Sequence, residues 1–260
     1  MSKYVFCDLD FTLLNDSREI SKDNYAAIKK FEEKGNHFII CSGRAPFAIE
    51  IYRDLLNSID AITSNGAVII SNNRIIKNEL LKKEIMLPIV EYAIKNNVNL
   101  RIFTSDNVYL LNQEKAPANA FVYNQSKNVN PEDVYDLIES SSIIKMVFAG
   151  EKEVLDKIKK DFEEMNMDIE ITFSAKNFLD VNTINQNKGN GVLDYCRYNN
   201  INIADTISVG DNDNDLSMLK ITGFSACPRN ANDSVKQTVD YICTNDNNHS
   251  AIKEILEKIS

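Results

Sequence analysis

The sequence has no apolar run long enough to cross a bilayer, and it carries neither a low-complexity tract nor an internal repeat. Its first residues lead straight into a short apolar segment, without the longer apolar core of a signal peptide. The five cysteines are odd in number, scattered and without CxxC spacing, which argues against a disulfide framework and a zinc site. We therefore expect a cytoplasmic protein with no membrane partner and with reduced, mostly buried thiols.

Histidine and positive charge are also scarce. The only histidines, His37 and His249, lie outside the polar clusters described below, so we expect neither to act in a site. Lysine and arginine number 29 against 38 aspartates and glutamates, and the resulting charge of -9 argues against nucleic acid as a partner. Small anionic substrates remain possible, because a bound cation can dominate the field at one site.

The two ends of the chain alternate strand and helix patterns. Continuous apolar runs at Tyr4–Cys7, His37–Cys41 and Ala61–Thr63 are separated by helical spacing from Ser21 to Glu33 and from the residues after Cys41 to about Leu56. The pattern resumes near Lys188 and ends in a helix that closes at Ile259. Alternation of this kind predicts an α/β fold with a doubly wound, mostly parallel sheet covered on both faces.

The middle of the chain has a different pattern. A hairpin at 67–76 is followed by helical segments near 83–95, 131–139 and 152–165, each accompanied by short strand-like runs. Such a mixture predicts an inserted α+β domain at 82–184. The core domain is then built from both ends of the chain, 1–81 and 185–260.

The first candidate cluster follows the first strand. Asp8 and Asp10 stand at its end, and Thr12 could orient Asp10 through its hydroxyl. A carboxylate beside a divalent cation can attack phosphorus, and a second one can protonate the leaving oxygen. A pair of acids in a surface turn is an equally good interpretation of this pattern when it is taken alone.

Two further clusters are weak when taken singly. Ser42-Gly43-Arg44 follows the second strand and is expected to open a helix, where a hydroxyl and free amides would bind an anion; a plain N-cap is the simpler alternative. Lys188 opens the helix after the insertion and could neutralise a nucleophile and a phosphoryl group. A lone lysine is more often a solvated surface residue.

The last cluster, Gly210-Asp211-Asn212-Asp213-Asn214-Asp215, follows the strand Thr206–Val209. Asp211 and Asp215 are one helical turn apart and can face one site, where oxygen ligands alone suit Mg²⁺. A calcium loop of the EF-hand type is a weak alternative, because its sixth and twelfth positions would be Leu216 and Thr222 instead of Gly and Glu. A helix start decorated with Asp is the remaining alternative.

Taken together, these clusters resemble the haloacid dehalogenase superfamily, whose pattern is a DxDxT motif, a Ser or Thr after the second strand, a Lys and a late GDxxxD motif. The inserted domain is similar to the cap of the Cof-type phosphatases of that superfamily. The resemblance implies a Rossmann-like core, and the residues that carry it are Asp8-Leu9-Asp10-Phe11-Thr12, Ser42, Lys188 and Gly210-Asp211-Asn212-Asp213-Asn214-Asp215.

By this resemblance Asp8 is the nucleophile and Asp10 the acid and base of a phosphatase that acts on sugar phosphates or related small metabolites. Mg²⁺ is held by the Asp8 carboxylate, the Asp10 main-chain carbonyl and Asp211, with Asp215 in support. Ser42 and Lys188 complete the catalytic set, and they bind the phosphate group together with Gly43 and Asn214. Phe11 stands where the family usually has Gly, which would cost free energy if this position needs a positive φ.

Other outcomes remain open at this stage. The same scaffold could carry a sugar phosphomutase or another phosphotransferase, which returns the phosphoryl group to bound substrate and excludes water. A phospholigand sensor without catalysis is a third hypothesis. We expect a monomer or a weak homo-oligomer, and the sequence identifies neither the substrate nor the residues of the inserted domain that select it.

Overall fold

The structure is a computed structural model that describes residues 2–118 and 120–259. It divides into two compact units. The first, the core unit, consists of the residues up to Arg44, Ile49–Lys77 and the residues from Asn187 on. The second, the cap unit, consists of Ala45–Ala48 and Asn78–Gln186. The insertion was expected at 82–184, and the grouping of Ala45–Ala48 with the cap unit was not anticipated.

One sheet of eight strands forms the centre of the core unit within the described part of the chain, in the order β14-β13-β12-β1-β2-β3-β4-β5. The pairs from β14 to β3 are parallel, and β4 pairs antiparallel with β3. This mostly parallel sheet confirms the predicted α/β fold class. The strands are β1 (Tyr4–Cys7), β2 (His37–Cys41), β3 (Ala61–Thr63), β4 (Val68–Ser71), β5 (Arg74–Asn78), β12 (Thr206–Val209), β13 (Phe224–Cys227) and β14 (Tyr241–Ile242).

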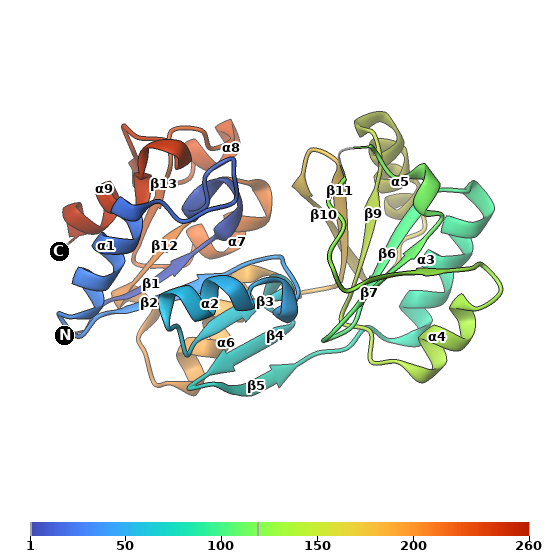
Figure 1. Ribbon diagram of the computed structural model, residues 1–260, viewed down its shortest axis with the longest axis horizontal. Coiled ribbons are helices and arrows are strands. Elements are labelled where there is room, and N and C mark those ends of the chain that lie inside the picture. Colours follow the sequence, from blue (N-terminus) through green and yellow to red (C-terminus); the bar gives the residue numbers. More distant parts are fainter. Residues whose placement is uncertain (1, 119, 260) are drawn as a thin grey trace. The chain divides into compact units, whose positions relative to one another are not determined.

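Helices pack on both faces of this sheet (Figure 1). One face carries α1 (Lys22–Glu32), α2 (Glu50–Leu56) and α9 (Ala251–Ile259); the other carries α6 (Lys188–Tyr198), α7 (Leu216–Leu219) and α8 (Asp233–Lys236). Because the central strands are buried from both sides, their residues are almost all apolar. Ser21 caps α1, since its Oγ accepts a hydrogen bond from the Asn24 amide at 3.1 Å.

The carboxyl ends of three neighbouring parallel strands meet at one edge of the core sheet. β1 lies between β2 and β12, with Cys7 paired to Ile40 on one side and to Val209 on the other. The chain leaves these strands at Asp8, at Ser42 and at Gly210. Three distant parts of the sequence therefore begin side by side, at the edge where open α/β sheets place their sites.

The segment after β2 differs from the expected helix start. Ser42 continues the hydrogen bonding of the sheet, because its amide donates to the Ile62 carbonyl at 2.8 Å. A 3₁₀ turn, η2 (Pro46–Ala48), follows, and α2 begins only at Glu50. Pro46 explains the delay, since it disfavours helical backbone at the residue before it and lacks an amide hydrogen. The prediction that Ser42-Gly43-Arg44 opens a helix was therefore wrong.

The cap unit has a sheet of its own, in the order β10-β11-β9-β6-β7-β8. The cluster of apolar side chains between the sheet and its helices involves α3 (Lys83–Asn96), α4 (Val134–Ser140) and α5 (Lys152–Glu164), which lie together on one side of it (Figure 1). Most of these strands pair antiparallel, and along each strand successive side chains point to opposite faces of the sheet. The strands are β6 (Asn99–Phe103), β7 (Val108–Leu111), β8 (Ser126–Val129), β9 (Lys145–Ala149), β10 (Ile169–Ala175) and β11 (Phe178–Thr183).

The five cysteines are free and buried, in keeping with the sequence. Within residues 2–118 and 120–259, no helix has both the length and the apolar character that a membrane span requires.

Candidate active site

Asp8 and Asp10 lie on either side of a tight turn that follows β1. The Asp8 amide donates to the Val209 carbonyl at 2.9 Å, which extends the sheet by one residue. The chain then turns over Leu9–Leu13, with Leu9 and Leu13 buried in the core as anchors. Phe11 takes the left-handed conformation in this turn, with φ of 58°. The carboxyl group of Asp8 is buried as a result, whereas the side chain of Asp10 is 38% exposed.

Lys188, the first residue of α6, is fully buried between two carboxylates. Its Nζ lies 2.6 Å from Asp8 Oδ1 and 2.5 Å from Asp215 Oδ1. The two carboxylates raise the pKa of Lys188 well above its ordinary value, although burial acts in the opposite direction. Lys188 therefore remains an ammonium group that links the ends of β1 and β12.

The close approach of α6 to the sheet depends on a glycine. Gly66 has φ of 92°, and a Cβ atom there would lie 2.6 Å from the Asn187 carbonyl oxygen, immediately before Lys188. Asn187 caps α6 by accepting a hydrogen bond from the Asn190 amide at 3.0 Å. Backbone contact and capping thus set the position from which Lys188 extends.

Asp215 organises the loop that follows β12. Its Oδ2 accepts hydrogen bonds from the amides of Asp211 at 2.9 Å and Asn212 at 3.0 Å. The carboxyl group can lie against the end of the strand because Gly210 has no side chain: a Cβ there would be 2.4 Å from Asp215 Cγ. Both oxygens of Asp215 are therefore engaged by the protein, one by Lys188 and one by the loop amides.

Asp8, Asp211 and Asp215 offer carboxylate oxygens that all lie within 4.8 Å of one another. Burial, together with the charges of Asp215 and Asp10, raises the pKa of Asp8 to about 7 against the effect of Lys188. Burial and the charge of Asp8 also raise the pKa of Asp211. One ammonium group does not compensate three buried carboxylates, and oxygen donors suit a hard divalent cation such as Mg²⁺, so these residues fit such an ion.

Thr12 contacts a different carboxylate from the one we expected. Its Oγ1 donates to Asp211 Oδ1 at 2.6 Å, although the sequence had suggested that it orients Asp10. Thr12 is fully buried, so this bond connects the turn after β1 with the loop after β12. Since the Thr12 hydroxyl engages one oxygen of Asp211, it can hold the other in a fixed direction.

Arg44 is the partner of Asp10, a relationship that the sequence did not indicate. Its Nε donates to Asp10 Oδ2 at 2.8 Å and its Nη2 to Asp10 Oδ1 at 2.6 Å. The guanidinium carbon lies 5.3 Å from the centre of the Tyr52 ring. The one usable signal was that Arg44 follows β2, the direct neighbour of β1.

The other predicted phosphate-binding residues lie on neighbouring loops. Ser42 is buried and its Oγ accepts a hydrogen bond from the Arg44 amide at 3.2 Å, so Ser42 and Gly43 form a tight turn at the end of β2. Asn214 lies in the turn η6 (Asp213–Asp215), and its Nδ2 donates to Asn65 Oδ1 at 3.4 Å. Asn65 itself has φ of 53°, in the left-handed region that Asn tolerates.

Residues 5–256 match the family model of the haloacid dehalogenase-like hydrolases. The chain belongs to this family. The match covers both units, so the resemblance noted in the sequence is confirmed for the whole chain and not only for its motifs.

Similar proteins with assigned names support the same conclusion. This chain is similar to two Bacillus subtilis proteins, YwtE and YcsE, each named 5-amino-6-(5-phospho-D-ribitylamino)uracil phosphatase. YwtE is 26% identical, and the match covers 99% of this chain and 98% of YwtE. YcsE is 28% identical, and the match covers 92% of this chain and 89% of YcsE. A solved structure of a subclass IIB sugar phosphatase has a TM-score of 0.85 at 21% identity, covering 99% of each chain. The first two are named phosphatases, which confirms the predicted enzyme class; the third shows the fold.

Proposed function

We propose that this chain hydrolyses small phosphomonoesters with Asp8 as the nucleophile and Mg²⁺ as the cofactor. The observation that carries the proposal is the buried contact of Lys188 with both Asp8 and Asp215, beside the third carboxylate of Asp211. An ionised carboxylate beside a cationic group can attack phosphorus and form an aspartyl phosphate.

Each step of this reaction has a residue that can carry it. In the first step an Asp8 oxygen bonds to phosphorus, the ester bond between phosphorus and oxygen breaks, and Asp10 gives its proton to the leaving oxygen. In the second step water attacks the same phosphorus, its proton passes to Asp10, and the bond from Asp8 to phosphorus breaks. The products are an alcohol and phosphate, and both carboxyl groups return to their starting state.

The remaining site residues bind and position the phosphoryl group. Lys188 offsets negative charge on Asp8 and on phosphate, and the Ser42 hydroxyl, the Gly43 main chain and the Asn214 amide bind phosphate oxygens. When bound, Mg²⁺ supplies further charge neutralisation at the phosphoryl group. The Asp8 and Asp211 carboxylates and the Asp10 carbonyl would hold it, with Asp215 in support.

The substrate proposal rests on the named relatives. YwtE and YcsE carry the name of a phosphatase of a phosphorylated ribityl compound, and the subclass IIB relative is a sugar phosphatase. By analogy, we propose that the substrate of this chain is a sugar phosphate or a related small metabolite, encountered in the cytoplasm. Its five free cysteines are consistent with that compartment.

The decisive experiment measures phosphate release from a panel of sugar, nucleotide and vitamin phosphates, with Mg²⁺ and with a chelator. The wild type should release phosphate only with the metal, and Asp8→Asn should release none, because the amide is a poor nucleophile of nearly the same shape. Asp23→Asn is the matched control, since it makes the same change on an exposed residue of α1. Undiminished turnover by Asp8→Asn would contradict the proposal.

A further inference from the structure

Arg101 is a buried arginine in the middle of the cap unit. It lies in β6 between Leu100 and Ile102, whose side chains belong to the apolar cluster under the helices. Because side chains alternate along a strand, Arg101 projects from the opposite face of the sheet. It pairs with Val147 of β9, and its exposed fraction is only 2%.

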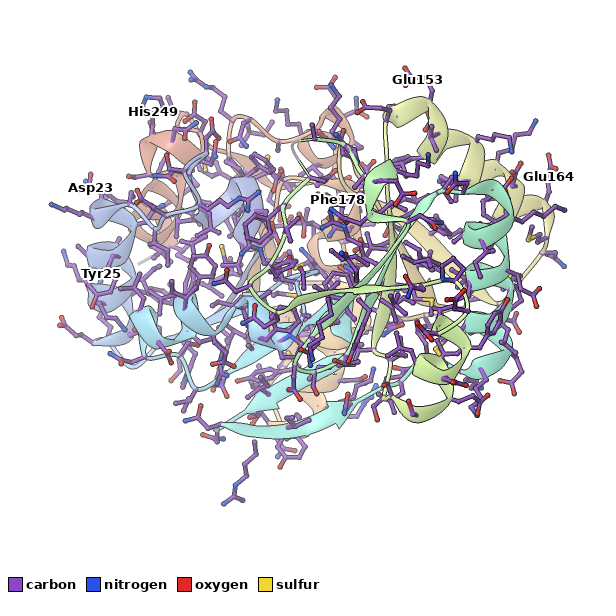
Figure 2. All side chains as sticks on the ribbon, turned by 45° about the vertical axis from the view of Figure 1, so that its right-hand side comes forward. Asp23, Tyr25, Glu153, Glu164, Phe178 and His249 are labelled. Carbon is purple, nitrogen blue, oxygen red and sulfur yellow. The ribbon has the colours of Figure 1, made fainter. Side chains whose placement is uncertain are left out.

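The contacts of Arg101 leave part of its guanidinium unused. Nη1 donates a hydrogen bond to the Phe121 carbonyl, and the guanidinium carbon lies 4.8 Å from the centre of the Phe178 ring. Figure 2 shows Phe178 on the side of the cap unit away from Glu153 and Glu164 of α5. Nε and Nη2, by contrast, are buried and have no hydrogen-bond partner among the described residues.

Two other arginines of the described chain, Arg44 and Arg53, differ from Arg101 in how their guanidinium groups are engaged. Arg44 uses its Nε and Nη2 to bind the carboxylate of Asp10 from the side. Arg53 donates from Nη1 to Glu50 Oε1 and from Nη2 to Asn73 Oδ1, each at 2.9 Å, so that Nε is its one nitrogen without a partner among the described residues. In Arg101 the edge formed by Nε and Nη2 has no such carboxylate. Two parallel N–H donors on this edge match the spacing of two oxygens in a carboxylate or phosphate group.

The nearby acid cannot serve as the missing partner. Asp180 of β11 pairs with Val147 and therefore shares the row of Arg101, two strands away. Its Oδ2 forms an ion pair with Lys145, and its Oδ1 accepts a hydrogen bond from Ser174 Oγ at 2.8 Å. Lys145 and Asp180 compensate each other, so Arg101 contributes an uncompensated positive charge to this buried face. Burial also lowers the pKa of Arg101, the direction expected for a cation without a counter-charge.

We propose that the Nε–Nη2 edge of Arg101 binds an oxyanion, a carboxylate or phosphate group, on the face of the cap sheet opposite its helices. Asn182 Oδ1, two residues along β11 from Asp180, is a second buried atom without a hydrogen-bond partner among the described residues, and it can accept a bond from a ligand hydroxyl. Phe121 lies between Lys115 and Ser126, where the described residues form neither helix nor strand. The oxyanion comes either from a second anionic group of the substrate, which rests on the proposed function, or from a separate anion.

The first test observes Arg101 directly in the full chain. The Nε–H signal of Arg101, assigned by its loss in Arg101→Lys or by through-bond correlation, is followed by NMR during titration with malonate and, separately, with inorganic phosphate. We expect a saturable shift with at least one of them and none with chloride at equal ionic strength. The Nε–H signal of Arg53 is the internal control, because this nitrogen is also buried without a partner but lies beside an Nη2 that already donates to Asn73 Oδ1, so Arg53 offers no open pair of donors.

The second test separates the two sources of the oxyanion. Arg101→Gln and the control Arg53→Gln are assayed on p-nitrophenyl phosphate and on phosphate esters that carry a carboxylate or a second phosphate. A substrate-borne oxyanion predicts a loss in kcat/KM of about 30-fold or more for Arg101→Gln on the second group alone. A saturable shift without this selectivity supports a separate anion. Absence of any shift with malonate, phosphate or the doubly anionic esters would overturn the proposal, while p-nitrophenyl phosphate hydrolysis reports on the Asp8 chemistry independently.

Discussion

Arg44 binds Asp10 through two parallel hydrogen bonds, from Nε to Oδ2 at 2.8 Å and from Nη2 to Oδ1 at 2.6 Å. The pair joins the turn after β1 to the turn after β2. Asp10 is partly exposed, so a carboxylate without this partner could rotate among several directions. We infer that Arg44 positions the proposed acid and base.

This pairing predicts a leaving-group effect. Arg44→Lys keeps the charge but loses the two-point contact, so kcat on an alkyl phosphate should fall roughly 100-fold. The loss on p-nitrophenyl phosphate should be much smaller, because its leaving group needs no proton. Tyr52→Phe is the matched control, since it keeps the ring beside the Arg44 guanidinium and removes only the hydroxyl, which accepts from Arg44 Nη1 at 3.4 Å and donates to the Arg18 carbonyl at 3.1 Å. Equal losses on both substrates would argue for a merely structural role.

Lys188 should matter for stability as well as activity. Lys188→Met leaves the buried carboxylates of Asp8 and Asp215 without their counter-charge, which should lower the free energy of unfolding by about 3–5 kcal/mol at neutral pH. This loss of unfolding free energy should be smaller at about pH 5, because Asp8 can there be neutralised by a proton in place of the Lys188 ammonium group. Urea unfolding of the metal-free protein at both pH values measures it, and an equal loss at both would contradict this account.

The raised pKa of Asp8 predicts how pH and metal act together. Because burial raises this pKa from 3.8 to about 7, the folded state binds the proton more tightly than the unfolded state. The contribution of Asp8 to stability is therefore present at low pH and is lost as pH rises toward about 7. Mg²⁺ binds the ionised carboxylate, so the stabilisation that Mg²⁺ provides should be larger at about pH 8 than at about pH 5.

Thermal unfolding with Mg²⁺ and with a chelator, across this pH range, measures the effect. Asp8→Asn is the comparison, because it removes the titrating group and should flatten the pH dependence of the metal-free protein. A metal effect that grows as pH falls would be inconsistent with the burial of these carboxylates.

Phe11 occupies a backbone conformation that costs free energy for any residue with a side chain. Its φ is 58° and its side chain is half exposed, so little packing offsets the cost. Phe11→Gly should be more stable than Phe11→Ala by about 1 kcal/mol, because both lose the ring and only Gly relieves the left-handed strain. Chemical denaturation of the two variants provides the measurement, and equal stabilities would show that the turn relaxes without cost.

Much of the architecture could be predicted from local patterns. Apolar runs and helical spacing anticipated the parallel core sheet, the hairpin after β3 and α6 from Lys188 to Tyr198. The missed helix start after β2 also has a local cause, since Pro46 and the sheet bond of the Ser42 amide postpone the helix to Glu50. The strand β8 has a polar sequence, Ser-Lys-Asn-Val, and depends on its pairing with β7.

For the candidate site, too, some features follow from local sequence and others from the tertiary structure. The sequence by itself determined which acids stand at strand ends, because strand ends and turn residues are properties of neighbouring positions in the chain. Only the tertiary structure decided that Lys188 contacts both Asp8 and Asp215, that Thr12 donates to Asp211 and not to Asp10, and that Arg101 lacks an anion. Those facts depend on side-chain directions and burial between segments up to 199 residues apart, which no local pattern encodes.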